Sequence, residues 1–130
     1  MLLGVWGSDI AAYAAGRLIG RRKLAEQISP AKTVEGLIAG LVAGIAIVFF
    51  TLYHQPHGNP LSPLHAFELG VAVAVAAPAG DLFESYLKRD AGIKDSGSLL
   101  GAHGGMLDRV DALLWAAPAT YFVALAIGRA

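Results

Sequence analysis

The chain has 130 residues, 55% of them hydrophobic, and a mean hydropathy of +0.56, so it is more apolar than a typical soluble domain of this length. Ten basic residues balance ten acidic ones, and bulk charge therefore gives no indication of nucleic-acid binding. The chain has no cysteine, which excludes disulfide bonds and thiolate metal sites. Met1 is followed by apolar residues without a basic stretch or an A-x-A cleavage site, so we expect no signal peptide.

Four long apolar segments follow one another along the chain, at residues 1–19, 34–53, 66–87 and 112–128. A bilayer core about 30 Å thick needs roughly 20 helical residues to cross it. The second segment has this length, and Glu35 is its charged residue. Buried helices of a soluble protein are the alternative, but four such helices would leave almost no polar faces for a surface. The segments therefore predict an all-α, polytopic bundle in the membrane, with about four transmembrane helices.

The basic residues gather around two of the three connections between these segments. The first connection and its borders hold Arg17, Arg21, Arg22, Lys23 and Lys32, and the third holds Lys88, Arg89, Lys94 and Arg109. The connection between them, residues 54–65, has neither lysine nor arginine. By the positive-inside rule, the two basic loops lie in the cytoplasm and residues 54–65 lie on the outer side.

Small residues line one face of the second segment, where Gly36, Gly40 and Gly44 recur every four residues. In a membrane, such a face lets another helix approach closely. The pattern fits packing within the chain and, equally, a homodimer through membrane helices. The first segment has a comparable stripe, in which Asp9 and Tyr13 share a face with further glycines.

Polar residues lie in and directly after the third segment. An ionisable group in a membrane helix is costly and therefore indicates a function. Helical spacing places four of them on one face: Asp81, Glu84, Ser85 and Lys88. Pro78 lies three residues before Asp81 and is expected to kink the helix or to unwind one turn. The end of the third helix therefore presents a charged face beside a predicted irregularity.

A second acidic pair, Asp108 and Asp111, lies one helical turn apart at the entry to the fourth segment. With Asp81 these carboxylates suit a hard cation such as Mg²⁺, which proteins hold through one or two carboxylates while phosphates and waters complete its shell. Basic residues suited to phosphate lie nearby: Lys88, Arg89, Lys94 and Arg109. Salt bridging at helix ends explains each acid taken singly, whereas the shared spacing and the basic companions favour a site for metal and phosphate.

Glycines surround His103 in the loop before the fourth segment, and Gly104 and Gly105 allow the backbone to approach a ligand closely. His103 itself fits phosphate binding, proton relay or a turn. The chain has no G-x-x-x-x-G-K-[ST] loop and no G-x-G-x-x-G motif, so a soluble nucleotide-binding fold is not indicated.

Residues 85–111, SYLKRDAGIKDSGSLLGAHGGMLDRVD, closely resemble the signature of phosphatidate cytidylyltransferases, also called CDP-diacylglycerol synthases. In that signature S-x-φ-K-R precedes K-D and then H-G-G-φ-x-D-R-φ-D, where φ is apolar. Residues 8–36, SDIAAYAAGRLIGRRKLAEQISPAKTVEG, resemble the preceding conserved region of the family. In this block, Ser29 as N-cap and Pro30 at the first helical position are expected to open the second helix and to point its N-terminus toward an anionic ligand.

The resemblance implies an enzyme that condenses CTP with phosphatidate, giving CDP-diacylglycerol and pyrophosphate, with Mg²⁺ as cofactor and a second cation left open. It assigns metal binding and catalysis to Asp81, Asp108 and Asp111, with Lys88 as a further catalytic residue. Asp9 is expected in the same polar cavity. The residues that it assigns to substrate binding are Ser85, Arg89, Lys94, His103, Gly104, Gly105, Arg109, Arg17, Ser29, Lys32 and Thr33.

Members of this family are typically longer, with more membrane helices before the matching region. Residues 1–130 are therefore expected to be the C-terminal catalytic region of a cytidylyltransferase in the bacterial cytoplasmic membrane, with its active site facing the cytoplasm. The expected partners are CTP, phosphatidate and the lipid bilayer. A related CTP-dependent enzyme acting on another lipid phosphate or on a polyprenol is one alternative. A non-catalytic membrane fragment, whose carboxylates serve transport or helix association, is the other.

Overall fold

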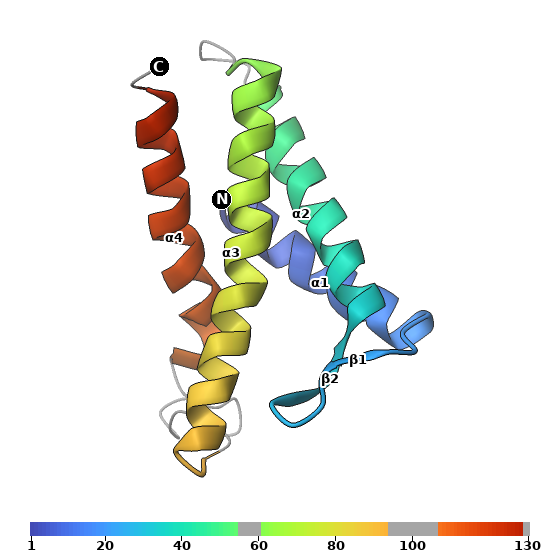
Figure 1. Cartoon of the computed structure of the whole chain (residues 1–130). Coiled ribbons are helices and arrows are strands. Elements are labelled where there is room, and N and C mark those ends of the chain that lie inside the picture. Colours follow the sequence, from blue (N-terminus) through green and yellow to red (C-terminus); the bar gives the residue numbers. More distant parts are fainter. Residues whose placement is uncertain (55–60, 94–106, 129–130) are drawn as a thin grey trace.

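The computed structural model describes residues 1–54, 61–93 and 107–128, and the side chains of all of these except 107–111. In chain order, the elements are α1 (Leu2–Leu18), β1 (Lys23–Ala25), β2 (Ser29–Thr33), α2 (Val34–Tyr53), α3 (Pro63–Asp90) and α4 (Leu107–Ile127) (Figure 1). Each of the four apolar segments forms a helix, which confirms the mostly helical fold predicted from the sequence. The two short strands were not predicted.

The helices α2 and α3 are, within the described ranges, the two that are long and apolar enough to cross a membrane by length and composition. The apolar part of α4, Ala112–Ile127, is shorter. Four membrane spans therefore stay a prediction. The helix α3 continues through Pro78 without a break, so no turn is unwound there, although its ring removes one backbone donor from the helix.

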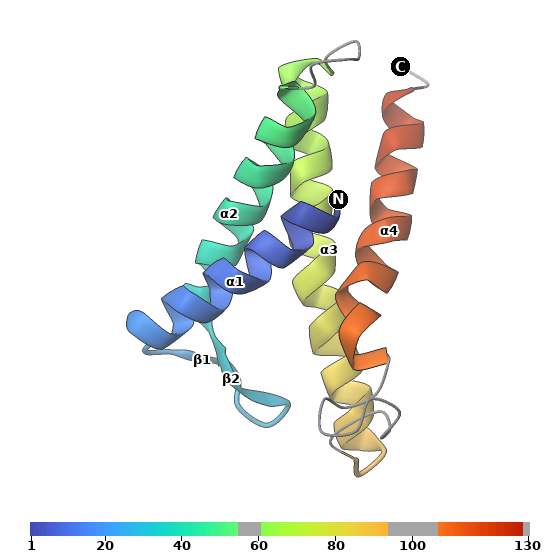
Figure 2. The same cartoon turned by 180° about the vertical axis from the view of Figure 1, so that it is seen from behind.

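The three longer helices form a layer, and α1 lies obliquely across one side of it (Figures 1 and 2). The helices α3 and α4 run in opposite directions side by side, and α2 packs on the other side of α3. In both views α2 and α3 lie close together near their connection and farther apart at their other ends. The two strands lie at this wider end, together with the C-terminal end of α3.

Small residues let the helices pack closely at the centre of the molecule. The buried apolar residues here are Val5, Val48, Leu69, Val73, Ala77, Ala112 and Ala116. A Cβ atom at Gly40 would lie 3.0 Å from the Ser8 carbonyl oxygen, and one at Gly44 would lie 3.1 Å from the Ser8 Cβ atom. The glycine face of α2 thus packs against α1 of the same chain. Packing within the chain therefore accounts for the glycine spacing, and dimerisation stays a prediction.

The strands β1 and β2 form an antiparallel hairpin (residues 23–33) between α1 and α2, in which Lys23 pairs with Thr33 and Ala25 with Ser29. This corrects the expectation that Ser29 and Pro30 open the second helix. The N-cap is Thr33, whose backbone is extended and whose Oγ1 accepts a hydrogen bond from the Gly36 N–H at 3.1 Å. A threonine at this position satisfies a donor that the first turn leaves without a helical partner, so the helix begins four residues later than expected.

Candidate active site

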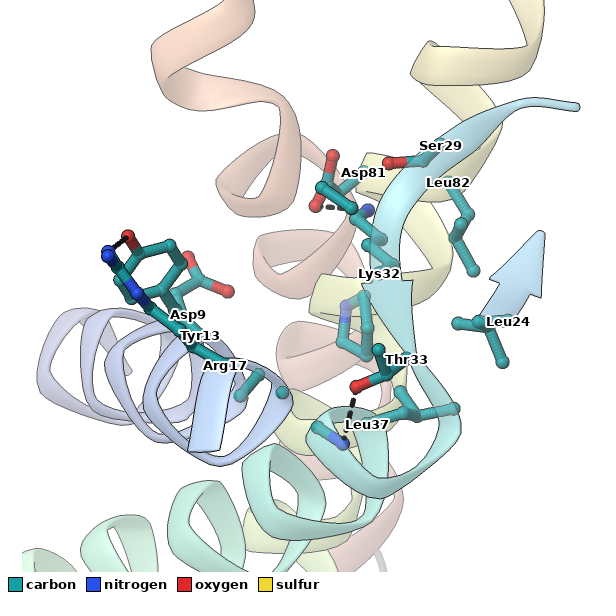
Figure 3. A pocket seen from close by; sticks show the side chains of 15 residues that line it. Asp9, Tyr13, Arg17, Leu24, Ser29, Lys32, Thr33, Leu37, Asp81 and Leu82 are labelled. Carbon is teal, nitrogen blue, oxygen red and sulfur yellow. Dashed lines mark hydrogen bonds and ion pairs between the residues drawn. The ribbon is translucent and has the colours of Figure 1, made fainter. Parts of the chain in front are cut away.

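A cavity of about 550 Å³ lies between α1, the hairpin, the first turn of α2 and the middle of α3 (Figure 3). Its polar lining residues are Asp9, Tyr13, Arg17, Ser29, Lys32, Thr33 and Asp81. Its apolar walls include Leu24, Leu37, Pro78 and Leu82. A cavity of this size, mostly apolar and with a few convergent polar groups, is typical of small-molecule sites.

The α1 wall of the cavity carries three polar side chains spaced one helical turn apart, Asp9, Tyr13 and Arg17. Nη1 of Arg17 donates a hydrogen bond to the Tyr13 hydroxyl at 2.9 Å. The predicted stripe of Asp9 and Tyr13 is therefore confirmed, and Asp9 lines the same cavity as Asp81. Tyr13 holds the Arg17 guanidinium on this wall, a role that the sequence analysis did not assign.

The opposite wall brings the hairpin against α3 through an ion pair between Lys32 Nζ and Asp81 Oδ2. The two side chains are 27% and 35% exposed, while Nζ itself is shielded from solvent. A residue predicted to bind metal and a residue predicted to bind substrate thus share one charge centre. Ser29 and Thr33, also predicted as substrate-binding, line the same cavity from β2.

The C-terminal part of α3 lies beyond the cavity. Glu84 is 7% exposed, and its carboxylate lies 3.2 Å from Lys88 Nζ in an ion pair one turn apart. Ser85 is partly buried, so the predicted face of Asp81, Glu84, Ser85 and Lys88 is confirmed as the more buried side of this helix end. The side chain of Arg89 is exposed and donates from Nε to the Ile28 carbonyl oxygen at 3.3 Å, which ties α3 to the tip of the hairpin.

The helix α4 runs back along α3 from the end nearest the predicted site. A Cβ atom at Gly80 would overlap the Trp115 ring, which also packs edge-on against Phe83 with ring centroids 5.1 Å apart. Helical register places Asp111 one turn and Asp108 two turns before Trp115, toward the C-terminal end of α3. The antiparallel packing of the two backbones therefore brings the first turns of α4 beside the α3 segment that follows Asp81.

Several predicted site residues lie outside the described residues: Lys94, His103, Gly104 and Gly105. The side chains of Asp108, Arg109 and Asp111 lie outside them too, although their backbone belongs to α4. Among the residues whose side chains are described, no group of three or more histidines and acids is placed to hold a metal ion. The predicted metal set thus contributes one described carboxylate, Asp81.

The fold and the cavity define a mostly helical protein in which two helices of the described ranges are long and apolar enough to cross a membrane, and carboxylates and basic side chains line one cavity. The chain belongs to the cytidylyltransferase family, whose sequence model matches residues 1–127.

Several relatives are named phosphatidate cytidylyltransferase. The chain is 40% identical to that of Aquifex aeolicus, over 94% of this chain and 44% of the relative. It is 41% identical to that of Bacillus subtilis, over 92% of this chain and 44% of the relative. It is also 43% identical, over 88% of this chain and 38% of the relative, to an Escherichia coli protein named Uncharacterized protein YnbB. The chain therefore spans less than half the length of these relatives.

Proposed function

We propose that the protein is a phosphatidate cytidylyltransferase, which transfers the cytidylyl group of CTP to phosphatidate and releases pyrophosphate. The observation that carries the proposal is the cavity in which Asp81 and Lys32 face the Arg17 wall, in a chain that is about 40% identical to enzymes named for this activity. Acidic groups suit a metal ion there, and basic groups suit the phosphates of both substrates.

The reaction joins two anions, which explains why basic residues gather around the cavity. An oxygen of the phosphatidate phosphate attacks the α-phosphorus of CTP and forms a new P–O bond. The bond from that phosphorus to the bridging oxygen of the β-phosphate breaks, and pyrophosphate leaves with the electron pair. Charge neutralisation and positioning supply most of the catalysis in such a transfer. The attacking phosphate is already ionised, so no strong general base is required.

The two facing walls of the cavity have different proposed roles in substrate binding. Arg17 on α1 and Lys32 on β2 neutralise phosphate oxygens, while Ser29 and Thr33 offer hydroxyl groups on the hairpin side. Lys88 acts on phosphate from the end of α3. The remaining proposed substrate contacts are Ser85, Arg89, Lys94, His103, Gly104, Gly105 and Arg109.

Asp81 brings a carboxylate to the wall of the cavity, and carboxylate oxygens are the ligands that Mg²⁺ prefers. The same carboxylate pairs with the Lys32 ammonium group, so the ion would share this position with a basic group suited to phosphate. We propose that Asp81, Asp108 and Asp111 together hold the ion. When bound, Mg²⁺ supplies positive charge to the phosphate oxygens and to the leaving pyrophosphate.

The proposed setting is the bacterial cytoplasmic membrane, with the four helices as membrane spans and the hairpin end toward the cytoplasm. Large apolar side chains are exposed on all four helices, among them Ile10, Val42, Phe67, Val75 and Phe122. Basic residues of the hairpin and of the α3 end lie together, at the end of the molecule opposite the α2–α3 connection (Figure 1). Phosphatidate then keeps its acyl chains among the helices in the bilayer while its phosphate reaches the cavity.

A transfer assay on the full-length protein in membranes tests the proposal. Labelled CTP is supplied with Mg²⁺ and with phosphatidate, another lipid phosphate or a polyprenol as acceptor. We expect labelled CDP-diacylglycerol with phosphatidate and little product with the others. A preference for another acceptor would favour a related CTP-dependent lipid enzyme. Cation flux without CTP binding would favour the non-catalytic alternative.

A further inference from the structure

Glu35 ties the start of α2 to the chain that leads into the hairpin. Its Oε2 atom accepts hydrogen bonds from the backbone N–H groups of Arg21, at 3.1 Å, and of Arg22, at 3.2 Å. The Arg22 carbonyl oxygen in turn accepts a hydrogen bond from the Val34 N–H at 2.9 Å. These contacts fasten the base of the hairpin to the first turn of α2.

The place of the hairpin decides which groups enter the cavity. Its strands supply Ser29, Lys32 and Thr33, and Lys32 must cross to α3 to reach Asp81. Thr33 at the end of β2 also packs against α1, since a Cβ atom at Gly16 would lie 2.9 Å from Thr33 Oγ1. A shift of the hairpin base would therefore move the basic group on this wall relative to the carboxylate it faces.

We propose that Glu35 is a positioning residue for the proposed reaction. Glu35 is not among the residues that line the cavity, so it acts through the hairpin. By holding two backbone N–H groups, its carboxylate sets where Lys32 lies relative to Asp81. The effect on catalysis rests on the proposed function, whereas the anchoring of the hairpin stands independently of it.

The geometry of this contact indicates that the reach of the Glu35 acceptor oxygen, and not its charge, holds the hairpin. Both hydrogen bonds end on one oxygen atom. The amide oxygen of Glu35→Gln has the same reach and accepts both bonds without carrying a charge. Glu35→Asp keeps the charge but is shorter by one methylene group, and Glu35→Ala has no acceptor. We therefore expect glutamine to replace glutamate and aspartate to fail. A role for the negative charge itself would give the opposite order.

Hydrogen exchange of the full-length protein in lipid nanodiscs, measured without substrate, tests the anchoring. We expect Glu35→Ala and Glu35→Asp to raise amide exchange at Arg21 and Arg22 about tenfold, as the loss of a hydrogen bond would do, while Glu35→Gln leaves it unchanged. Glu26→Ala, which removes an exposed carboxylate from the hairpin, is the matched control and should change neither amide. Unchanged exchange in Glu35→Ala, or equal loss of protection in Glu35→Gln, overturns the proposal.

The same variants separate positioning from a purely structural role in the transfer assay. We expect kcat to fall about tenfold or more in Glu35→Ala and Glu35→Asp and to stay near the wild-type value in Glu35→Gln. If Glu35→Ala does not fold, the comparison of Gln with Asp still decides between reach and charge. Absence of transfer by the wild-type protein would overturn the proposed function, and the exchange pattern would still decide the role of Glu35.

Discussion

Lys32 of β2 and Asp81 of α3 form an ion pair that joins the hairpin to the middle of the longest helix. The sequence predicts substrate binding for Lys32 and metal binding for Asp81, and the fold brings the two residues to one wall of one cavity. Removal of either partner leaves the other facing the cavity without this neighbour, so the pair is the most direct place to test the proposed chemistry.

Replacement of Asp81 by asparagine should abolish most of the transfer activity. The change removes a carboxylate from the proposed magnesium site while keeping the shape of the side chain. Loss of one group that stabilises transition-state charge costs about 10²–10³-fold in kcat. Turnover of CTP with phosphatidate measures the effect, and Asp90→Asn, at the exposed end of the same helix, is the control. Normal turnover in Asp81→Asn would remove this residue from the site.

Asp108 and Asp111 should be needed for magnesium dependence. We expect Asp108→Asn and Asp111→Asn each to lose turnover while the melting temperature stays close to that of the unaltered protein, because asparagine keeps the size and shape of aspartate. Chelation of divalent ions in the unaltered protein should stop the reaction, and added Mg²⁺ should restore it. Retained activity in both variants would mean that the metal assignment is wrong.

The close packing of α1 against α2 predicts that a larger residue at position 36 lowers the stability of the fold. A Cβ atom there would lie 2.6 Å from the Ala12 carbonyl oxygen, which cannot move unless α1 shifts. Overpacking of this kind costs about 1–3 kcal/mol, more than alanine gains over glycine in helix propensity. Gly36→Ala should therefore lower the unfolding temperature in detergent.

Gly7→Ala is the matched control for this prediction. A Cβ atom at Gly7 would meet the end of the Ile47 side chain, which can turn away without moving a helix. This variant should keep or raise the unfolding temperature. An equal drop in both variants would show that the two sites do not differ as the packing indicates.

The membrane orientation can be measured with single cysteines, because the chain has none of its own. Gln27 lies exposed in the turn of the hairpin, and His54 lies exposed after the end of α2. In intact cells, an impermeant thiol reagent should label His54→Cys and should label Gln27→Cys only after the membrane is opened. The reverse pattern would invert the proposed topology.

The helices were predictable because apolar segments of this length rarely form any other structure. The apolar segment 34–53 coincides with α2, although the helix was expected to begin earlier, at Pro30, and the glycine spacing on that helix correctly indicated a close neighbour. The spacing of Asp9 and Tyr13 likewise placed both on the cavity wall. In each case the spacing of residues along one helix was enough for the prediction, so no information about contacts between distant residues was required.

The hairpin was not predictable in the same way. Its strands are short and show no clear alternation of apolar and polar residues, and Ser29-Pro30 is locally typical of a helix start. The backbone instead pairs β2 with β1, and Thr33 supplies the cap. The reach of Lys32 to Asp81 and the turn of Glu35 back to Arg21 depend on that pairing, so they appear only in three dimensions.

The close approach of α1 and α2 makes the α1 wall of the cavity stiffer than the wall formed by the hairpin and α3. Backbone lies against backbone along the glycine face, so the α1 backbone that carries Tyr13 and Arg17 cannot move away from α2 without separating the two helices. On the far wall, the Lys32–Asp81 ion pair and the Arg89–Ile28 hydrogen bond join the hairpin to α3. A ligand too large for the cavity would widen it on that compliant side. The free-energy cost of binding such a ligand would then depend on these two polar contacts, which the anionic groups of a substrate can themselves replace.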